Sequence, residues 1–207
     1  MSEHIKKIGV IGAGQMGSGI AHVCALSGFN VHLVDISPEN LERAMSEIER
    51  NMARQVEREE ITAAAAEAAQ KLISTGSDYA GFGDCQMVVE AATENEAVKK
   101  EILKDLCPHL SEDALVASNT SSISITRLGS YTDGPGKFVG MHVMNPVPRM
   151  ELVELIRGIA TDEDTFSVFK DLTLRLGKTP VSAEDFPAFI VNRILLPMVN
   201  EAIYTLY

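Results

Sequence analysis

His142 and Glu154 are the side chains whose types and spacing first suggest chemistry. They lie twelve positions apart in the stretch GMHVMNPVPRMELVELIRG, residues 140–158, with two prolines and an asparagine between them. Imidazole has an ordinary pKa of about 6.5, so it accepts a proton readily near neutral pH. A carboxylate on its other ring nitrogen would fix the tautomer and stabilise the imidazolium. The pair therefore suggests a general base with its orienting acid, and the alternative is a structural histidine unrelated to Glu154.

Two predicted strands position this pair. The apolar run KFVGMHV, residues 137–143, reaches His142 near its end, and MELVELI, residues 150–156, contains Glu154. Because a proline-rich turn joins the two runs, we expect Glu154 to lie on a strand next to that of His142.

Strands and helices alternate through the rest of the chain. We expect strands at 5–11, 30–36, 72–75, 86–91, 114–118 and 178–183, and helices at 15–28, from 38 onward, 62–72, 95–107, 163–177 and from Ala188 to the end, where Pro197 would kink the helix. This order predicts the α/β class, with a Rossmann-type doubly wound, mostly parallel sheet.

A glycine-rich turn joins the first strand to the first helix. Gly12, Gly14 and Gly17 fit GxGxxG, with Gln15 and Met16 at the start of the helix. In this context the glycines permit a tight turn and close approach of a pyrophosphate, which helix amides would bind. Asp35 ends the next strand, where a carboxylate would accept hydrogen bonds from ribose and repel a 2′-phosphate. The pattern therefore predicts NAD as cofactor, and the alternative is a plain glycine turn with a capping aspartate.

Three polar segments follow predicted strands: ATEN at 92–95, SNTSS at 118–122 and HVMNP at 142–146. The carboxyl ends of parallel strands share one edge of a sheet, so we expect these segments to meet there. SNTSS also suits a helix cap. A serine hydrolase would need a GxSxG turn, which the sequence lacks. No histidine, cysteine and acid cluster has metal-ligand spacing, so we expect no metal.

Composition limits the partners and the compartment. The formal net charge is −11, which disfavours nucleic acid as a partner. Three scattered cysteines suit free thiols in a reducing cytoplasm, and no apolar run has the length of a membrane span. We therefore expect a cytoplasmic protein that binds neither nucleic acid nor membrane.

Five motifs in one order carry a specific resemblance. The segments are GVIGAGQMGSGIA, VVEAATENEAVKKEIL, ASNTSSISIT, GMHVMNPVPRMELVELIRG and FIVNRILLPMVNEAI. Together they resemble the L-3-hydroxyacyl-CoA dehydrogenase family, with the bacterial 3-hydroxybutyryl-CoA dehydrogenases as the nearest type. The resemblance implies reversible NAD-linked oxidation of a (3S)-3-hydroxyacyl-CoA to a 3-oxoacyl-CoA.

The resemblance also implies roles for residues. His142 corresponds to the catalytic base, Glu154 to its partner, Ser121 to a substrate-binding serine and Asn192 to an asparagine that holds the active site together. Residues near the cofactor would be Glu94, Lys99, Asn119 and Asn145. Contacts to coenzyme A would come from Asn51, Arg54 and Arg58 on the long second helix.

The sequence departs from the family pattern in three places. HVMNP replaces the commoner HFFNP beside His142. Ala188 stands where the family usually has glycine, which matters if that position needs a positive φ. Family members continue into a helical C-terminal domain, whereas this sequence stops at Tyr207.

These departures shape the expected organisation. We expect an NAD-binding Rossmann domain over 1–186 and the first helix of a helical dimerisation domain over 187–207. The apolar residues of 189–207 would drive homo-oligomer formation. Catalysis would be weakened, because part of the cleft wall is missing. Two alternatives stay open: a self-associating NAD-binding domain with little activity, or a hydroxy-acid dehydrogenase of the same superfamily.

Overall fold

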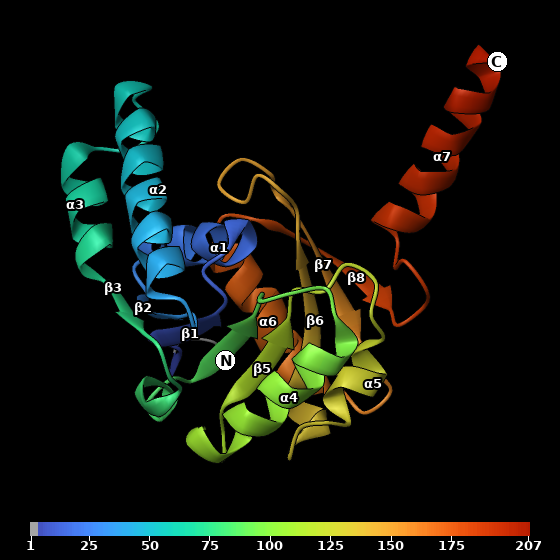
Figure 1. Ribbon diagram of the computed structural model, residues 1–207, viewed down its shortest axis with the longest axis horizontal. Coiled ribbons are helices and arrows are strands. Elements are labelled where there is room, and N and C mark those ends of the chain that lie inside the picture. Colours follow the sequence, from blue (N-terminus) through green and yellow to red (C-terminus); the bar gives the residue numbers. More distant parts are fainter. Residues whose placement is uncertain (1–3) are drawn as a thin grey trace.

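Eight strands form one sheet in the computed structural model, which describes residues 4–207 (Figure 1). Their order across the sheet is β3-β2-β1-β4-β5-β6-β7-β8. The strands are β1 (Lys7–Ile11), β2 (Asn30–Val34), β3 (Ile73–Gly76), β4 (Met87–Glu90), β5 (Leu115–Ser118), β6 (Phe138–Val143), β7 (Leu152–Arg157) and β8 (Thr179–Glu184). The helices are α1 (Gln15–Leu26), α2 (Pro38–Glu57), α3 (Ala63–Lys71), α4 (Glu96–Leu106), α5 (Ile125–Gly129), α6 (Glu163–Arg175) and α7 (Val191–Leu206).

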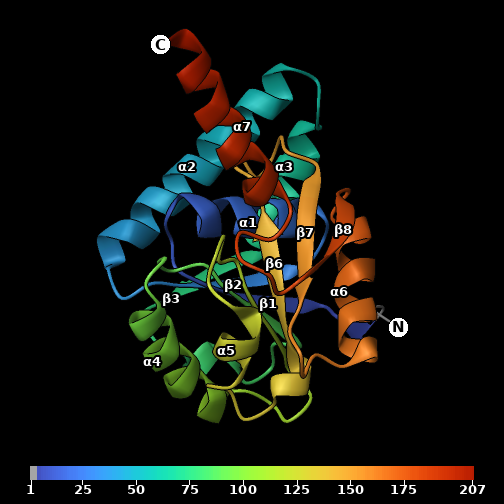
Figure 2. The same cartoon turned by 90° about the vertical axis from the view of Figure 1, so that its right-hand side faces the viewer.

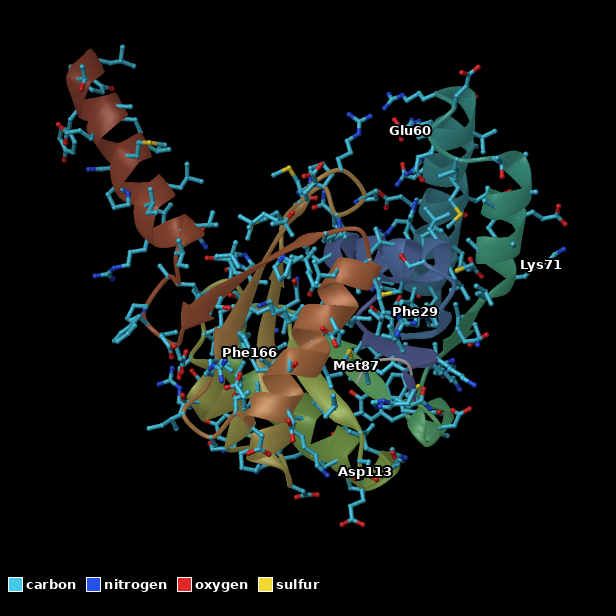
Figure 3. The ribbon with its side chains drawn as sticks, turned by 180° about the vertical axis from the view of Figure 1, so that it is seen from behind. Phe29, Glu60, Lys71, Met87, Asp113 and Phe166 are labelled. Atoms are coloured by element: carbon cyan, nitrogen blue, oxygen red, sulfur yellow. The ribbon has the colours of Figure 1, made fainter. Side chains whose placement is uncertain are left out.

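Helices cover both faces of the sheet, because its central strands are apolar on both sides. Figure 2 shows α4 and α5 on one side of the sheet and α6 on the other. One apolar cluster joins α1, α2, α3 and α6 to the sheet, and a second joins α4 and α5 to its opposite face. Phe29 and Phe166 belong to the first cluster and are labelled on that face in Figure 3. The predicted doubly wound α/β fold is confirmed.

Strand direction changes once in the sheet. Every neighbouring pair is parallel except β6 and β7, which are antiparallel. In that register His142 lies directly opposite Glu154. Residues at paired positions present their side chains to the same face of a sheet, so the turn between β6 and β7 brings the two together.

The last helix leaves the sheet and projects away from it (Figure 1). We expected this helix to begin at Ala188, but α7 begins at Val191. Ala188 and Phe189 have positive φ angles of 67° and 50°, which a right-handed helix cannot contain. The left-handed pair turns the chain before α7 starts, and α7 then continues through Pro197.

Apolar side chains are exposed along α7. The exposed large hydrophobic residues of this helix and its end are Ile194, Leu195, Leu196, Met198, Val199, Ile203, Tyr204, Leu206 and Tyr207. We call this set the α7 apolar surface. Over residues 4–207, no helix combines the length and apolar character that crossing a membrane requires.

Candidate active site

The imidazole of His142 and the carboxylate of Glu154 are in direct contact. Nδ1 of His142 lies 2.6 Å from Oε2 of Glu154. Glu154 is fully buried and His142 is 8% exposed, so the imidazole alone retains a small accessible surface. With Nδ1 engaged by the acid, the ring presents Nε2 to other partners. The contact expected from the sequence is present, and its catalytic role stays a prediction.

Glu154 also receives the start of α7. Its Oε1 accepts hydrogen bonds from the backbone amides of Ile190, at 2.9 Å, and Val191, at 2.8 Å. Burial alone would raise the pKa of Glu154, but the hydrogen bonds from His142 and from these two amides hold its pKa below the ordinary value. The carboxylate is therefore kept charged beside the imidazole.

A cavity of about 370 Å³ opens next to His142. It gathers predicted residues from four separate parts of the sequence, at the carboxyl edge of the parallel strands. Its lining comprises Gly14, Gln15, Met16, Ala91, Ala92, Thr93, Glu94, Lys99, Asn119, Ser121, His142, Val143, Met144 and Asn145. We call it the first cavity.

The glycine turn borders the first cavity and requires its glycines. Gly12 has a φ of 96°, and a Cβ on Gly17 would lie 1.7 Å from the carbonyl oxygen of Gly12. Only glycine allows α1 to approach β1 this closely. The first turn of α1 has no side-chain cap and no acidic residue, so its amides and its positive end remain available to an anion.

Asp35 links the glycine turn to the start of α2. Its Oδ2 accepts from the amide of Ala13 at 2.7 Å, and its Oδ1 accepts from the amide of Ser37 at 2.9 Å and from Nδ2 of Asn40 at 3.1 Å. Asp35 therefore stabilises the turn and the start of α2, as the alternative of a capping aspartate predicted. It also lines a cavity, as a residue that binds the cofactor would.

That second cavity, of about 790 Å³, lies on the other side of the glycine turn. Ala92 and Thr93 line both cavities, so the two cavities adjoin at these residues. Apolar side chains that the sequence analysis did not single out form much of its wall, including Ile36, Tyr79, Val98 and Ile102. Ile36 is 91% exposed. The sequence signal for this wall was Ile36 itself, an apolar residue directly after Asp35 at the end of the second strand.

Glu94 organises the loop that carries Ser121. Its Oε1 accepts from the hydroxyl of Thr120 at 2.8 Å, and from the amide and hydroxyl of Ser121 at 2.8 Å and 2.9 Å. Partial burial would raise the pKa of Glu94, but these hydrogen bonds lower it below the ordinary value. The acid thus supports the serine loop as well as lining the first cavity.

Lys99 was predicted to lie near the cofactor, but its ammonium is buried and paired with an acid. It lines the first cavity, yet it is buried in an ion pair with Glu90, at 2.8 Å and 2.6 Å from the two carboxylate oxygens. The hydroxyl of Ser118 donates to the same carboxylate at 2.6 Å. Sequence analysis missed Glu90, because a single acid within an apolar strand carries no motif.

Two asparagines connect elements around the cavity. Oδ1 of Asn119 accepts from the amide of Val143 at 2.9 Å and so ties the ends of β5 and β6. Nδ2 of Asn192 donates to the carbonyl oxygen of Ser121 at 3.3 Å and ties α7 to the serine loop. These contacts bring Asn192 and Ser121 together with the pair at His142.

The predicted coenzyme A residues lie apart from the first cavity. Asn51, Arg54 and Arg58 line a third cavity, of about 280 Å³, between α2 and the loop that joins β6 to β7. That loop contributes Arg149, which the sequence analysis did not single out. Three arginines and one acid, Glu60, therefore line one hollow in a chain with net charge −11.

The chain is similar to known proteins in both sequence and fold. The family described as 3-hydroxyacyl-CoA dehydrogenase, NAD binding domain, matches residues 7–186. A 3-hydroxybutyryl-CoA dehydrogenase of Bradyrhizobium diazoefficiens is 56% identical over all 207 residues, which cover 71% of that relative. The crystal structure of (S)-3-hydroxybutyryl-CoA dehydrogenase from Ralstonia eutropha has a TM-score of 0.94 and 43% identity, over 96% of this chain and 70% of that one.

A crystal structure of 3-hydroxybutyryl-CoA dehydrogenase from Escherichia coli is similar as well. Its TM-score is 0.95 at 38% identity, over 98% of this chain and 43% of that one. Fold and sequence together define an NAD-binding dehydrogenase domain of the Rossmann type. The chain belongs to the 3-hydroxyacyl-CoA dehydrogenase family, whose NAD-binding domain it carries.

Proposed function

We propose that the chain catalyses NAD-dependent oxidation of (3S)-3-hydroxybutanoyl-CoA to the 3-oxoacyl-CoA, and the reverse reaction. One observation carries the proposal: the contact of 2.6 Å between Nδ1 of His142 and Glu154, with the imidazole in the wall of a cavity that begins at the glycine turn. Relatives named 3-hydroxybutyryl-CoA dehydrogenase support the choice of substrate.

The chain fits NAD at the glycine turn. No atom lies within 4 Å of the place where a Cβ on Gly14 would be, so a pyrophosphate can approach the backbone there. The amides at the start of α1 would hold it, and Asp35 would accept from ribose. The second cavity, with Ile36 and Val98 on its wall, would enclose the adenine end. When bound, NAD supplies the acceptor for the hydride.

His142 would hold the proton that leaves the substrate hydroxyl. As the carbon–hydrogen bond transfers its electron pair, the hydroxyl proton passes to Nε2. The charged Glu154 stabilises the resulting imidazolium and keeps Nδ1 protonated. In the reverse direction the imidazolium returns its proton to the 3-oxo oxygen. Ser121 would donate to the substrate oxygen once its hydroxyl turns away from the Glu94 carboxylate, and Asn192 would hold the serine loop in place.

The third cavity would bind phosphate groups of coenzyme A. Arg54, Arg58 and Arg149 line it and would supply paired donors to phosphate oxygens, with Arg58 released from its ion pair with Glu60. A hydroxy acid without coenzyme A would leave this cavity unused. A screen of 3-hydroxyacyl-CoA compounds against free hydroxy acids therefore tests the substrate class, and preference for the free acids would favour the hydroxy-acid alternative.

His142→Gln tests the chemical step. The expected result is a loss of about 10²- to 10⁴-fold in acetoacetyl-CoA-dependent oxidation of NADH, because the proton donor is removed. NADH affinity should stay within about twofold, since the amides of the glycine turn are unchanged. His4→Gln, at an exposed histidine that lines none of the three cavities, is the matched control. Equal turnover by His142→Gln and the unmodified chain would contradict the mechanism and favour a binding domain.

We also propose that the α7 apolar surface mediates self-association. Nine large apolar side chains lie exposed on one short segment, a density that favours burial against a partner surface. A second copy of the chain is the partner that the sequence analysis favours.

The cysteines are consistent with a cytoplasmic location, which stays part of the proposal. Cys24, Cys85 and Cys107 are unpaired thiols. Burial raises the pKa of Cys24 to about 12 and that of Cys85 to about 11, so both thiols are unreactive at neutral pH. Free thiols of this kind suit a reducing compartment.

A further inference from the structure

Lys178 is a buried lysine that the proposed chemistry does not use. It lies just before β8 and is 7% exposed. Its Nζ donates to two backbone carbonyl oxygens, those of Val147 at 2.7 Å and Met150 at 2.8 Å. Both acceptors belong to residues 144–151, the loop that joins β6 to β7.

The surroundings make this charge costly. Burial lowers the pKa of Lys178, which shows that the site disfavours the ammonium. The nearby Cys24 thiol, with a pKa of about 12, is neutral, and burial also lowers the pKa of the neighbouring His22. Glu151 offsets the cost in part. An apolar side chain of similar length would fill the space without this penalty. We therefore expect the ammonium to be present for its hydrogen bonds to the loop.

The 144–151 loop is packed against the domain at Val147, whereas Asn145 and Arg149 of the same loop are exposed. Its turn is closed by hydrogen bonds from the amides of Arg149 and Met150 to the carbonyl oxygen of Pro146, both at 3.0 Å. Val147 is buried and lies against Gly19 of α1, where an added Cβ would approach it to 2.7 Å. Lys178 supplies the polar attachment of the same turn to the start of β8.

Two proposed binding sites share this loop. Asn145 lines the first cavity, and Arg149 lines the third. Lys178 lines neither cavity, so any effect on ligands must pass through the loop. Charge-assisted hydrogen bonds of 2.7–2.8 Å are strong enough to hold one backbone arrangement.

We propose that Lys178 is a positioning residue that sets the 144–151 loop for both ligands. Its ammonium fixes the Val147 and Met150 carbonyls, and thereby places Asn145 toward the cofactor and Arg149 toward the phosphates of coenzyme A. The inference rests on the proposed function for the identity of the two ligands. The test uses binding, so that it can succeed or fail apart from catalysis.

Lys178→Met is the first test variant, because methionine fills a similar volume and leaves both carbonyls without their donor. The dissociation constants of NADH, by fluorescence, and of free coenzyme A, by calorimetry, should each rise about tenfold. Lys170→Met removes an exposed lysine of α6 and should change neither constant. Should Lys178→Met fail to fold, Lys178→Gln keeps an amide donor without the charge and should weaken both ligands by a smaller factor.

A double-mutant cycle separates positioning from general destabilisation. Asn145→Ala should weaken NADH in the unmodified chain, but should add little in the Lys178→Met background, since the loop is already displaced. Unchanged dissociation constants with only a lower unfolding midpoint would overturn the inference, as would weakening of one ligand alone. If both ligands weaken but the unmodified chain does not turn over acetoacetyl-CoA, the inference stands and the proposed function fails.

Discussion

Glu154 is the residue on which the geometry of the site depends. It is buried in the middle of β7, and its two carboxylate oxygens serve different partners: His142 on one side and the amides of Ile190 and Val191 on the other. The sequence predicted the first contact, since a proline-rich turn between two predicted strands puts Glu154 on the strand next to that of His142; the directly opposed register is a finding of the structure. The sequence did not predict the second contact, which joins residues 36 and 37 positions apart through a turn that no motif specifies.

Glu154→Gln should reduce the acid sensitivity of folding. Because the pKa of Glu154 is lowered in the folded chain, its ionisation contributes stability above the unfolded value of about 4.3, and that contribution is lost as the pH falls through the folded pKa. Urea unfolding between about pH 3 and pH 7 measures this. The stability difference between the unmodified chain and the variant should be greatest at neutral pH and shrink below about pH 4. A difference that is constant with pH would contradict the assignment.

Gly14→Ala and Gly17→Ala should separate binding from folding. At Gly14 an added Cβ meets no protein atom within 4 Å, so the variant should fold within about 0.5 kcal/mol of the unmodified chain but bind NADH at least about tenfold more weakly. At Gly17 the Cβ would collide with the Gly12 carbonyl, so folding itself should suffer, by more than about 2 kcal/mol. Thermal unfolding and NADH fluorescence measure the two effects. Full NADH affinity in Gly14→Ala would remove the case for a cofactor at this turn.

At the scale of elements, local patterns predicted most of the sheet and its helices. Apolar runs marked the buried strands, and Gly28 and Gly177 ended α1 and α6 with the positive φ angles expected there. The start of α7 was placed three residues too early, because alanine favours helices and the sequence does not reveal the two left-handed residues. Glu90 and Arg149 were missed for a related reason: their roles come from neighbours on other elements.

Ala188→Gly should stabilise the turn before α7. An alanine with φ of 67° carries a cost of about 1 kcal/mol, and glycine removes it while adding a smaller cost in unfolded-chain entropy. The expected gain is about 0.5 kcal/mol, or about 1–2 °C in Tm. Ala68→Gly, at an exposed position within α3, should have the opposite effect, about 1 kcal/mol of destabilisation. Destabilisation by both variants would argue against strain at Ala188.

At the scale of the whole molecule, the charge and the apolar surface act in opposite senses. A net charge of −11 disperses copies of the chain, whereas the α7 apolar surface favours contact between them. The chain spans 71% of the length of the Bradyrhizobium relative and 70% of that of the Ralstonia structure. Its sheet, glycine turn and His142–Glu154 pair all lie within that span.

Leu196→Glu with Ile203→Glu tests self-association. Two charges placed on the α7 apolar surface should convert an associating chain to monomer in sedimentation velocity at micromolar concentration, because burying them would be costly. Asn200→Glu adds charge to the same helix without removing an apolar side chain, and it should change the sedimentation profile much less. A monomeric profile for the unmodified chain under these conditions would contradict the proposal.

The double engagement of Glu154 gives α7 an influence on acidity. If α7 tilted so that the two amide hydrogen bonds to Oε1 lengthened, the carboxylate would retain its proton more readily. Glu154 thus joins the outward-projecting helix to the imidazole of His142, and a binding event that moved α7 would alter the charge beside that imidazole without contact with the reactants.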